Sequence, residues 1–347
     1  MTPTVGVVLV NYNGLADTRE CLRSLAAVSY PRWFPVVVDN ASTEDPTPIL
    51  VSEFPGCPVL RQPVNAGWAG GNNAGIRFSL NHGADYVVLL NNDTVLAPEL
   101  LGRLVSAAEA HRGYGVLGPV IRQFDPPHDV QTDGCVFNAP GRPEFFQRLE
   151  VPLAASDPPT VTDVDIVNGC CLMAPGAVFR RVGLIDERFF LIHEESDFCL
   201  RVRRAGLRCG VLGEALVRHK GSRSFRRSGL RGQRYYDARN LLLLLTKHGY
   251  LPGLRRGRLR SLLAYAKYAY ARYEAERDAG CPNAADAVLE GVCDALTRNL
   301  GPHQPGDRLL LPLLRRLFEL RRGRACRLDS AAKLPFPRFE LPEGRTA

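Results

Sequence analysis

The sequence predicts an α/β fold, in which helices flank a sheet, with a helical extension at the C-terminal end. In the first half, short apolar runs alternate with stretches whose apolar residues recur at helical spacing, the pattern of a doubly wound parallel sheet. Beyond residue 245 helical periodicity continues alone. With 347 residues the chain is long enough for a large domain and an extension, so we predict domains at 1–245 and 246–347.

The expected elements follow a regular order. Strands are predicted at 5–11, 35–39, 58–61 and 86–90. Helices are predicted at 15–27 and 98–110, and a loop at 65–73 is expected to lead into a further helix that continues to residue 80. Later strands are predicted at 116–121, 166–174 and 210–217, and later helices at 178–182 and 195–205. The intervening segment 125–159 is rich in proline and glycine and is expected to be a loop-like insertion.

The C-terminal part is expected to contain helices at 241–245, 259–277, 284–300 and 309–322. The last of these places leucines on one stripe beside basic residues, which are Arg315, Arg316, Arg321 and Arg322. We expect this stripe to dock onto the preceding domain. The alternative is that it lies on an anionic membrane.

Composition narrows the class of protein. The chain has 45% hydrophobic and 23% charged residues, which is typical of a globular protein and not of a disordered or fibrous one. No apolar run is long enough to span a bilayer, so we expect a cytoplasmic location. The ten cysteines show no zinc-site spacing and are expected to be buried reduced thiols. The net charge of +8 gathers in basic clusters, notably at 218–234, which favour phosphates, anionic lipids or nucleic acid.

Polar side chains follow several predicted strands. Asn11, Asp39-Asn40 and Asn91-Asn92-Asp93 each come where an apolar run ends. The carboxyl ends of parallel strands meet at one edge of a sheet, which is where ligands bind in open α/β folds. Asp93 there would meet a hard metal ion and a diphosphate, and Asp39 would accept hydrogen bonds from a base or a ribose. The alternative is ordinary turn chemistry.

Two further features carry possible chemistry. Gly67, Gly70 and Gly71 are interleaved with asparagines between 65 and 73, which suits close approach to a ligand, or else a plain tight loop. Glu194 and Glu195 are adjacent carboxylates that raise one another's pKa, which suits a general base; the alternative is a solvated acidic helix N-terminus. The turn after the first strand has no Gly-x-Gly-x-x-Gly, which argues against a dinucleotide-binding fold.

In combination these motifs resemble glycosyltransferase family 2, and within it the rhamnosyltransferase-like bacterial members. The resemblance covers residues 4–245 and rests on motifs that occur in the same order. They are Asn11-Tyr12-Asn13-Gly14, Val38-Asp39-Asn40-Ala41-Ser42, the Asn65–Asn73 cluster, Leu90-Asn91-Asn92-Asp93-Thr94, Asn168-Gly169, the 189–201 segment around Glu194-Glu195-x-Asp197, and His219.

The resemblance implies a GT-A fold, which is a Rossmann-like mixed sheet flanked by helices. It also implies a nucleotide-diphosphate sugar donor, inversion at the anomeric carbon, and a divalent metal, Mg or Mn. It implies that Asp93 and His219 hold the metal. The donor-binding residues it implies are Asn11, Asp39, Asn40, Asn65, Gly71, Asn72, Asn92 and Asp93. Asparagine at 91 and 92 departs from the acidic form of the metal motif, so metal affinity is expected to be low or to depend on bound donor.

The same resemblance favours Glu195 as the catalytic base, with Glu194 positioning the acceptor. Asp197 is expected to anchor the segment by pairing with Arg201 one turn later. The basic loop is expected to bind the leaving diphosphate or a lipid-linked acceptor through Lys220, Arg223, Arg226 and Arg227. Tyr235-Tyr236-x-x-Arg239-Asn240 also resembles a segment of these members, but its residues alone assign it no role.

The resulting hypothesis is an inverting glycosyltransferase that is cytoplasmic and peripherally associated with the inner face of the plasma membrane. It would move a sugar to a hydroxyl of a glycan or lipid-linked glycan in cell-wall or polysaccharide synthesis. L-Rhamnose from dTDP-rhamnose is one candidate donor, and UDP-galactose and UDP-GlcNAc stay open. One alternative is an inactive nucleotide-sugar-binding scaffold, which the asparagines at 91 and 92 allow. The other is a nucleic-acid-binding protein, but the basic loop contains few of the aromatic residues that such binding would use. The oligomeric state and the linkage are left open.

Overall fold

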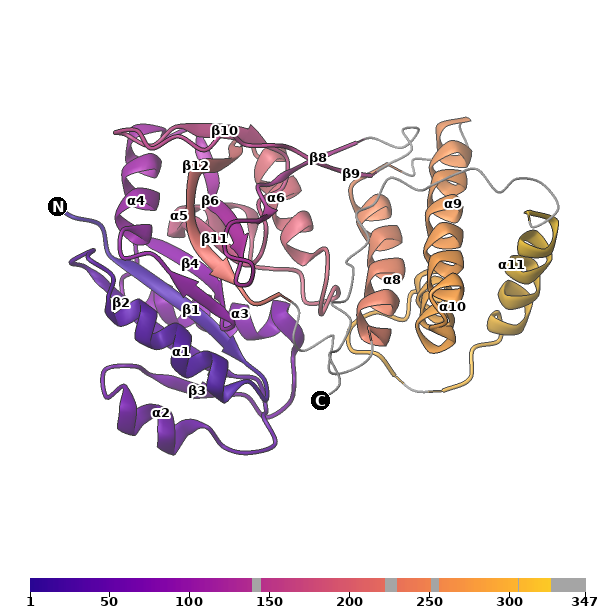
Figure 1. Ribbon diagram of the computed structural model, residues 1–347, viewed down its shortest axis with the longest axis horizontal. Coiled ribbons are helices and arrows are strands. Elements are labelled where there is room, and N and C mark those ends of the chain that lie inside the picture. The colour runs from indigo at the N-terminus through magenta and orange to yellow at the C-terminus, as the bar shows by residue number, and fades with distance from the viewer. Residues whose placement is uncertain (139–144, 222–229, 251–255, 305, 326–347) are drawn as a thin grey trace. The chain divides into compact units, whose positions relative to one another are not determined.

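A computed structural model describes residues 1–138, 145–221, 230–250, 256–304 and 306–325. Residues 1–308 form one compact unit and residues 309–347 a second. The first unit contains a ten-stranded mixed sheet with helices on both of its faces (Figure 1). The predicted α/β class with a helical extension is confirmed, and the division at residue 245 stays a prediction.

The sheet has the strand order β10-β12-β6-β11-β4-β1-β2-β3, with β5 on β12 and β7 on β6. Its strands are β1 (Val5–Asn11), β2 (Trp33–Asp39), β3 (Val59–Arg61), β4 (Tyr86–Asn91), β5 (Thr94–Leu96), β6 (Tyr114–Gln123), β7 (Val130–Thr132), β10 (Val161–Val164), β11 (Cys171–Pro175) and β12 (Arg208–His219). A separate pair is formed by β8 (Cys135–Phe137) and β9 (Phe146–Arg148). The expected parallel core is present in β1 to β4, whereas β11 runs antiparallel to β4 and makes the sheet mixed.

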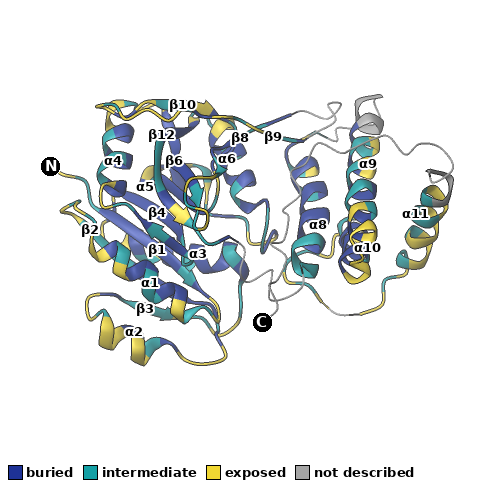
Figure 2. Cartoon of the chain, in the orientation of Figure 1, coloured by how far each residue is buried: buried dark blue, intermediate teal, exposed yellow. Residues whose placement is uncertain are grey.

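The helices of this half are α1 (Leu15–Ala26), α2 (Thr47–Glu53), α3 (Gly67–Asn81), α4 (Leu100–Ala110), α5 (Gly176–Val182) and α6 (Glu194–Arg204). Alternate side chains of β1 point to opposite faces of the sheet. Val5, Val7 and Leu9 join the core cluster that includes leucines of α1 and α4. Val8 and Val10 face α3, where glycines 71 and 75 let the helix approach the strand closely. Figure 2 shows the central strands buried and the outer helix faces exposed.

Parallel register brings the polar strand ends together. In β1, Asn11 pairs with Asp39 of β2, and Val10 pairs with Asn91 of β4. The carboxyl ends of these three strands therefore lie at one edge, as the sequence predicted. This edge is the platform for the candidate site.

Two local expectations were wrong. The segment 65–73 was expected to be a loop, but α3 already begins at Gly67, so Gly71 and Asn72 are helical and buried. The 166–174 strand begins only at Cys171, because Asn168 Oδ1 accepts a hydrogen bond from the Cys170 N–H in a turn. The 125–159 insertion contains the short strands β7, β8 and β9 among its described residues.

The second half is helical, as predicted, with α8 (Arg231–Lys247), α9 (Arg256–Asp278), α10 (Pro282–Thr297) and α11 (Leu311–Ala325). Figure 1 shows α8, α9 and α10 side by side, and α10 packs on both of its neighbours. On α11 and just before it, Leu309, Leu313, Leu317 and Leu320 are exposed. Whether this stripe docks on the first unit or on a membrane stays a prediction. Among the described helices, none combines the length and apolarity needed to cross a membrane.

The cysteines of the described chain are free thiols. Seven of these nine are buried, Cys135 is half-buried and Cys281 is exposed. Burial raises the pKa of Cys21 to about 12, which keeps this thiol protonated and inert. The expectation of buried reduced thiols is confirmed for those seven.

The start of α3 generates a first prediction. Gly67 has φ +70°, and a Cβ placed on it would lie 2.3 Å from the backbone oxygen of Phe190. Gly83, just past the other end of the helix, has φ +79° with open space around it. We expect Gly83→Ala to lose about 1–2 kcal/mol of unfolding free energy from the left-handed backbone alone. Gly67→Ala is expected to lose about 1–3 kcal/mol more, because a backbone oxygen blocks the new methyl group.

Chemical denaturation of both variants and the wild type measures this difference. Equal losses for the two alanine variants would show that Gly67 and Phe190 do not pack as closely as described.

Candidate active site

The ends of β1 and β2 are joined by a buried polar network. Asn11 Nδ2 donates to Asp39 Oδ1 at 2.9 Å and to Ser42 Oγ at 3.1 Å, while Ser42 Oγ donates to Asp39 Oδ1 at 2.5 Å. Asp39 is fully buried. Its carboxylate therefore fixes the loop after β2. The sequence also predicted that Asp39 binds the donor. This stays a prediction, and it would require a ligand to reach below this loop.

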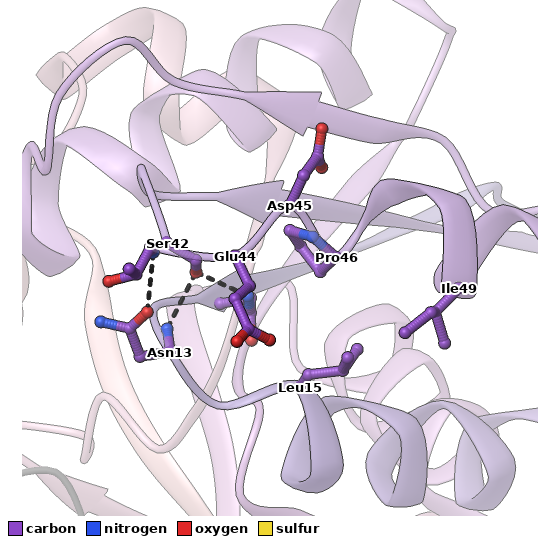
Figure 3. A pocket seen from close by; sticks show the side chains of 9 residues that line it. Asn13, Leu15, Ser42, Glu44, Asp45, Pro46 and Ile49 are labelled. Atoms are coloured by element: carbon purple, nitrogen blue, oxygen red, sulfur yellow. Dashed lines mark hydrogen bonds between the residues drawn. The ribbon is translucent and has the colours of Figure 1, made fainter.

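A pocket of about 310 Å³ opens over this network (Figure 3). Its lining residues are Asn11, Asn13, Leu15, Ser42, Thr43, Glu44, Asp45, Pro46 and Ile49. Figure 3 shows Leu15 and Ile49 on the side of the two helices, with Asn13 and Ser42 opposite them, on the loops that follow β1 and β2. Leu15, Pro46 and Ile49 supply the apolar part of the lining and the other six residues are polar, which suits a flat ring with hydrogen-bonding edges.

The asparagine and glycine residues predicted to bind the donor are engaged within the protein. Asn40 Nδ2 donates to Asn65 Oδ1 at 3.0 Å and to the Gly67 carbonyl at 2.9 Å. Asn72 Nδ2 donates to the Trp68 carbonyl at 2.9 Å, and a Cβ on Gly71 would lie 2.8 Å from Val10. These residues hold α3 against the strand ends, and their contact with a donor stays a prediction.

Asp93 and His219 lie side by side at the same edge. His219 Nε2 is 3.0 Å from Asp93 Oδ1, and its Nδ1 is 3.0 Å from Gln131 Oε1. The pairing of β12 with β5, in which His219 lies opposite Thr94, produces this contact. Burial opposes ionisation of Asp93, but the hydrogen bond with His219 and the charge of Lys220 outweigh it and hold the pKa of the carboxyl below its usual range. Asn92 lies nearby, donating to Thr18 Oγ1 at 2.8 Å.

This pair fits a divalent metal only in part. An ionised carboxylate and an imidazole nitrogen are both metal ligands, and their contact atoms are adjacent. Within the described residues, no three His, Cys, Asp or Glu side chains gather into a metal site. A metal held by Asp93 and His219 would therefore need oxygens from the donor diphosphate and from water to complete its coordination.

A chain of contacts leads from this pair to the acidic segment. Asn91 Nδ2 lies 3.5 Å from His219 Nε2, and Asn91 Oδ1 accepts a hydrogen bond from Trp68 Nε1 at 3.0 Å. A Cβ on Gly169 would lie 3.3 Å from Trp68 Cζ2 and 3.4 Å from the Cβ of Glu195. Because Gly169 has no side chain, the Trp68 indole and Glu195 both lie next to its backbone and line the same surface.

Glu194 and Glu195 have different surroundings. Glu194 is buried, and its Oε2 has no hydrogen-bond partner among the described residues. Burial, and then the charge of Glu195, raise the pKa of Glu194 well above its usual value. Glu195 is half-buried and accepts a hydrogen bond from Ser196 Oγ at 3.2 Å. The pair therefore combines a buried acid whose ionisation is opposed by its surroundings with a more accessible carboxylate, an arrangement that suits a base beside a positioning group.

Asp197 anchors the acidic segment. The predicted pair with Arg201 is present, with Arg201 Nε 2.8 Å from Asp197 Oδ2. Asp197 Oδ1 also lies 2.8 Å from His248 Nε2 and 2.7 Å from Lys247 Nζ. Asp197 is fully buried among these three side chains, which makes it a structural anchor and not a group open to substrate.

The basic segment 218–234 is described at its two ends, 218–221 and 230–234. Lys220 Nζ lies 2.6 Å from Asp17 Oδ1 and 2.5 Å from Glu20 Oε2, both on α1. A diphosphate would have to compete with these two carboxylates for the ammonium group. Arg223, Arg226 and Arg227 lie outside the described residues, so the diphosphate role of the whole loop stays a prediction.

Sequence reasoning missed Trp68 and Gln131. Trp68 is one of only two tryptophans in the chain and lies inside the glycine-asparagine cluster, a signal that could have found it. Gln131 lies in the insertion, 88 residues from His219, and no sequence pattern indicated their contact.

Comparison with known proteins decides the class. Residues 6–156 match the model of glycosyl transferase family 2. Over these residues the chain thus resembles glycosyl transferase family 2. It is 27% identical over 214 residues to the low-salt glycan biosynthesis hexosyltransferase Agl10 of Haloferax volcanii, covering 60% of this chain and 65% of that protein.

Two relatives are named for rhamnose. The dTDP-rhamnosyl transferase RfbF of Shigella flexneri is 25% identical, over 72% of this chain and 82% of its own length. The N-acetylglucosaminyl-diphospho-decaprenol L-rhamnosyltransferase of Mycobacterium tuberculosis is 25% identical, over 80% of this chain and 96% of its own. The predicted resemblance to family 2 and to its rhamnosyltransferase-like members is thus confirmed, and the chain is a glycosyltransferase that takes a nucleotide-sugar donor.

A solved structure supports the fold. The mannosyltransferase PcManGT from Pyrobaculum calidifontis, in complex with GDP-Man and Mn²⁺, aligns with a TM-score of 0.51 and 19% identity over 95% of this chain and 82% of that one. At this identity the likeness shows the fold alone, and the predicted GT-A fold is confirmed.

The surroundings of Glu194 generate a second prediction. Its pKa is raised above 4.5 in the folded state, so stability is fully present below about pH 4.5, where both states are protonated. As the pH rises, the unfolded state ionises freely while the folded state resists, and stability falls. Glu194→Gln removes this loss, so its melting temperature should exceed that of the wild type by a margin that is smallest at pH 5 and grows towards pH 8.

Thermal unfolding between pH 5 and pH 8 measures the margin, with Glu99→Gln, at an exposed carboxylate, as the control. A margin that shrinks as the pH rises would contradict the buried neutral acid.

Proposed function

We propose that this chain transfers L-rhamnose from dTDP-L-rhamnose to a hydroxyl group of a lipid-linked glycan, with inversion at the anomeric carbon. The choice of sugar is supported by the two relatives named as rhamnosyltransferases. The lipid-linked acceptor is supported by the Mycobacterium tuberculosis relative, whose name gives a diphospho-decaprenol acceptor. UDP- and GDP-sugars, and glycans without a lipid, are the alternatives that the experiments below separate.

One observation carries the proposal. The contacts from Glu195 past Gly169, Trp68 and Asn91 to His219 and Asp93 form a continuous wall along the carboxyl edge of the sheet. A carboxylate base at one end and a carboxylate-imidazole pair at the other are what glycosyl transfer requires, because the acceptor and the diphosphate lie on opposite sides of the anomeric carbon.

The reaction then follows from this arrangement. The acceptor hydroxyl oxygen forms a bond to the anomeric carbon while the bond from that carbon to the diphosphate oxygen breaks, and the electron pair leaves with the nucleoside diphosphate. Glu195 takes the hydroxyl proton. Asp93 and His219 would hold a divalent metal, which neutralises charge on the diphosphate when bound. Trp68, between them, offers an apolar face against which a sugar ring can stack.

Glu194 completes the site without taking part in proton transfer. As a buried acid kept neutral by its surroundings, it carries a hydroxyl that can donate a hydrogen bond. This neutral state also avoids a second negative charge beside Glu195 during the reaction. The sequence hypothesis that Glu194 positions the acceptor is retained in the proposal.

Donor identity is tested by thermal shift. A ligand that binds only the folded state raises the melting temperature by mass action. We expect dTDP-rhamnose with manganese to give the largest shift among dTDP-, UDP-, GDP- and CDP-sugars, and omission of manganese to reduce it. Asp93→Asn should abolish the manganese-dependent part, whereas Asp157→Asn, at a strongly exposed carboxylate, should retain it.

A larger shift with a UDP- or GDP-sugar would replace the donor and leave the reaction class intact. No shift with any nucleotide sugar and manganese would contradict the proposed function.

The base is tested by turnover. With dTDP-rhamnose and an N-acetylglucosaminyl-diphospho-prenol acceptor, Glu195→Gln should lower kcat by about 10²–10⁴-fold, because the acceptor proton loses its base. The donor-induced melting shift should be unchanged. An inactive scaffold would show the same shift in both proteins and no turnover in the wild type, and a Glu195→Gln variant with wild-type kcat would exclude this residue as the base.

A further inference from the structure

The segment that leads to the acidic pair has an unusual backbone. Phe190, Ile192 and His193 have φ values of 65°, 69° and 71°, in the left-handed region that residues other than glycine rarely adopt. Conformations of this kind are unfavourable on their own and persist only where the surroundings fix them. His193 is the N-cap residue of α6 and directly precedes Glu194. The conformation of this segment therefore sets where the two glutamates begin.

Helix α8 holds this segment through its backbone carbonyls. Asn240, which is fully buried, donates from Nδ2 to the carbonyls of Phe189 at 2.8 Å, Leu191 at 2.6 Å and Ile192 at 2.8 Å. Arg239 donates from Nη2 to the Phe189 carbonyl at 2.8 Å and from Nε to Asn240 Oδ1 at 2.8 Å. The last bond orients the asparagine amide so that both of its N–H groups face the segment.

A second contact from α8 reaches His193. Its Nε2 lies 3.1 Å from Asp237 Oδ1, and the ring of Phe146 stacks on the imidazole with centroids 4.9 Å apart. Asp237 is held in turn by the hydroxyl of Tyr268 on α9, at 2.7 Å and 2.9 Å from its two oxygens. The side chain of the N-cap residue is thus fixed from α8, α9 and β9.

We propose that Asn240, Arg239 and Asp237 are positioning residues, which clamp the 189–193 segment in the strained conformation that presents Glu194 and Glu195. We call these three residues the α8 clamp. The clamp gives a role to the Tyr235-Tyr236-x-x-Arg239-Asn240 motif, whose residues alone indicated none. Its effect on turnover rests on the proposed function, whereas its effect on the backbone does not.

A general packing role for α8 would look different. Tyr235 is on the same helix, is equally buried and donates from its hydroxyl to Asp294 on α10 at 2.6 Å, inside the helical region. Asn240 directs its donors to the carbonyls of the residues immediately before the acidic pair. Tyr235→Phe therefore removes one buried hydrogen bond of α8 without removing any bond to the segment, and it serves as the matched control.

The test compares Asn240→Asp with Tyr235→Phe in the full chain. Asn240→Asp keeps the side-chain shape but replaces the N–H donors by an oxygen, which repels the carbonyls. By hydrogen-exchange mass spectrometry, amides in peptides covering 189–197 should exchange at least ten times faster in Asn240→Asp, with Tyr235→Phe close to wild type there. With dTDP-rhamnose, kcat should fall at least tenfold while the donor KM and the donor-induced melting shift stay unchanged.

Asp237→Asn gives a second reading if Asn240→Asp does not fold. It keeps the shape at Asp237 and removes the charge that faces His193, so exchange should rise around 193–197 and kcat should fall. Unchanged exchange in the segment, or the same increase in Tyr235→Phe, would overturn the clamp. Unchanged kcat in variants whose segment exchanges faster would overturn its positioning role.

The outcomes also separate this inference from the proposed function. If the wild type transfers no sugar from any donor, the proposed function fails, and hydrogen exchange alone decides whether the α8 clamp exists. If the wild type is active and the clamp variants match it in kcat and exchange, the function stands and the clamp is wrong.

Discussion

The parallel register of β1, β2 and β4 is the constraint on which the rest of the molecule depends. It places Asn11 opposite Asp39 and Val10 opposite Asn91, so the polar residues after each strand meet at one edge. The register is fixed because the two buried faces of the strands are packed differently, with α1 and α4 on one side and the close approach of the α3 glycines on the other. A slip of one residue would exchange these faces and disperse the polar edge.

The antiparallel additions to this core complete the site. The pairing of β5 with β12 carries His219 to Asp93, and the turn before β11 carries Gly169 to Trp68 and Glu195. None of these partners is close in sequence, so the site exists only when the mixed part of the sheet is formed. Most polar groups at the edge bond to one another, which orients them before any ligand arrives. The buried Glu194 is the exception, since its Oε2 lacks a partner among the described residues.

The sequence could predict what depends on local pattern. Apolar runs located the strands, and the spacing of Asp197 and Arg201 by one helical turn predicted their ion pair. It could not predict that the glycine-asparagine cluster is helical from Gly67, because that depends on how closely α3 packs against β1. Nor could it predict that Lys220 pairs with Asp17 and Glu20, two carboxylates about 200 residues away. The candidate site residues could be named from the sequence, but the partners that fix their geometry are non-local.

The α8 clamp shows why the helical half matters to the chemistry. A strained segment beside a buried acid opposes folding, so the contacts that hold it must lie elsewhere in the chain. Asn240 lies before the predicted domain boundary at residue 245, and Lys247 and His248, which hold Asp197, lie after it. Both sides of that boundary therefore act on the same segment. If α8 and the residues just beyond it support the acidic pair, a chain ending at residue 245 would keep the sheet edge and the pocket beside Asn11 and Ser42 but lose the contacts of Lys247 and His248 with Asp197.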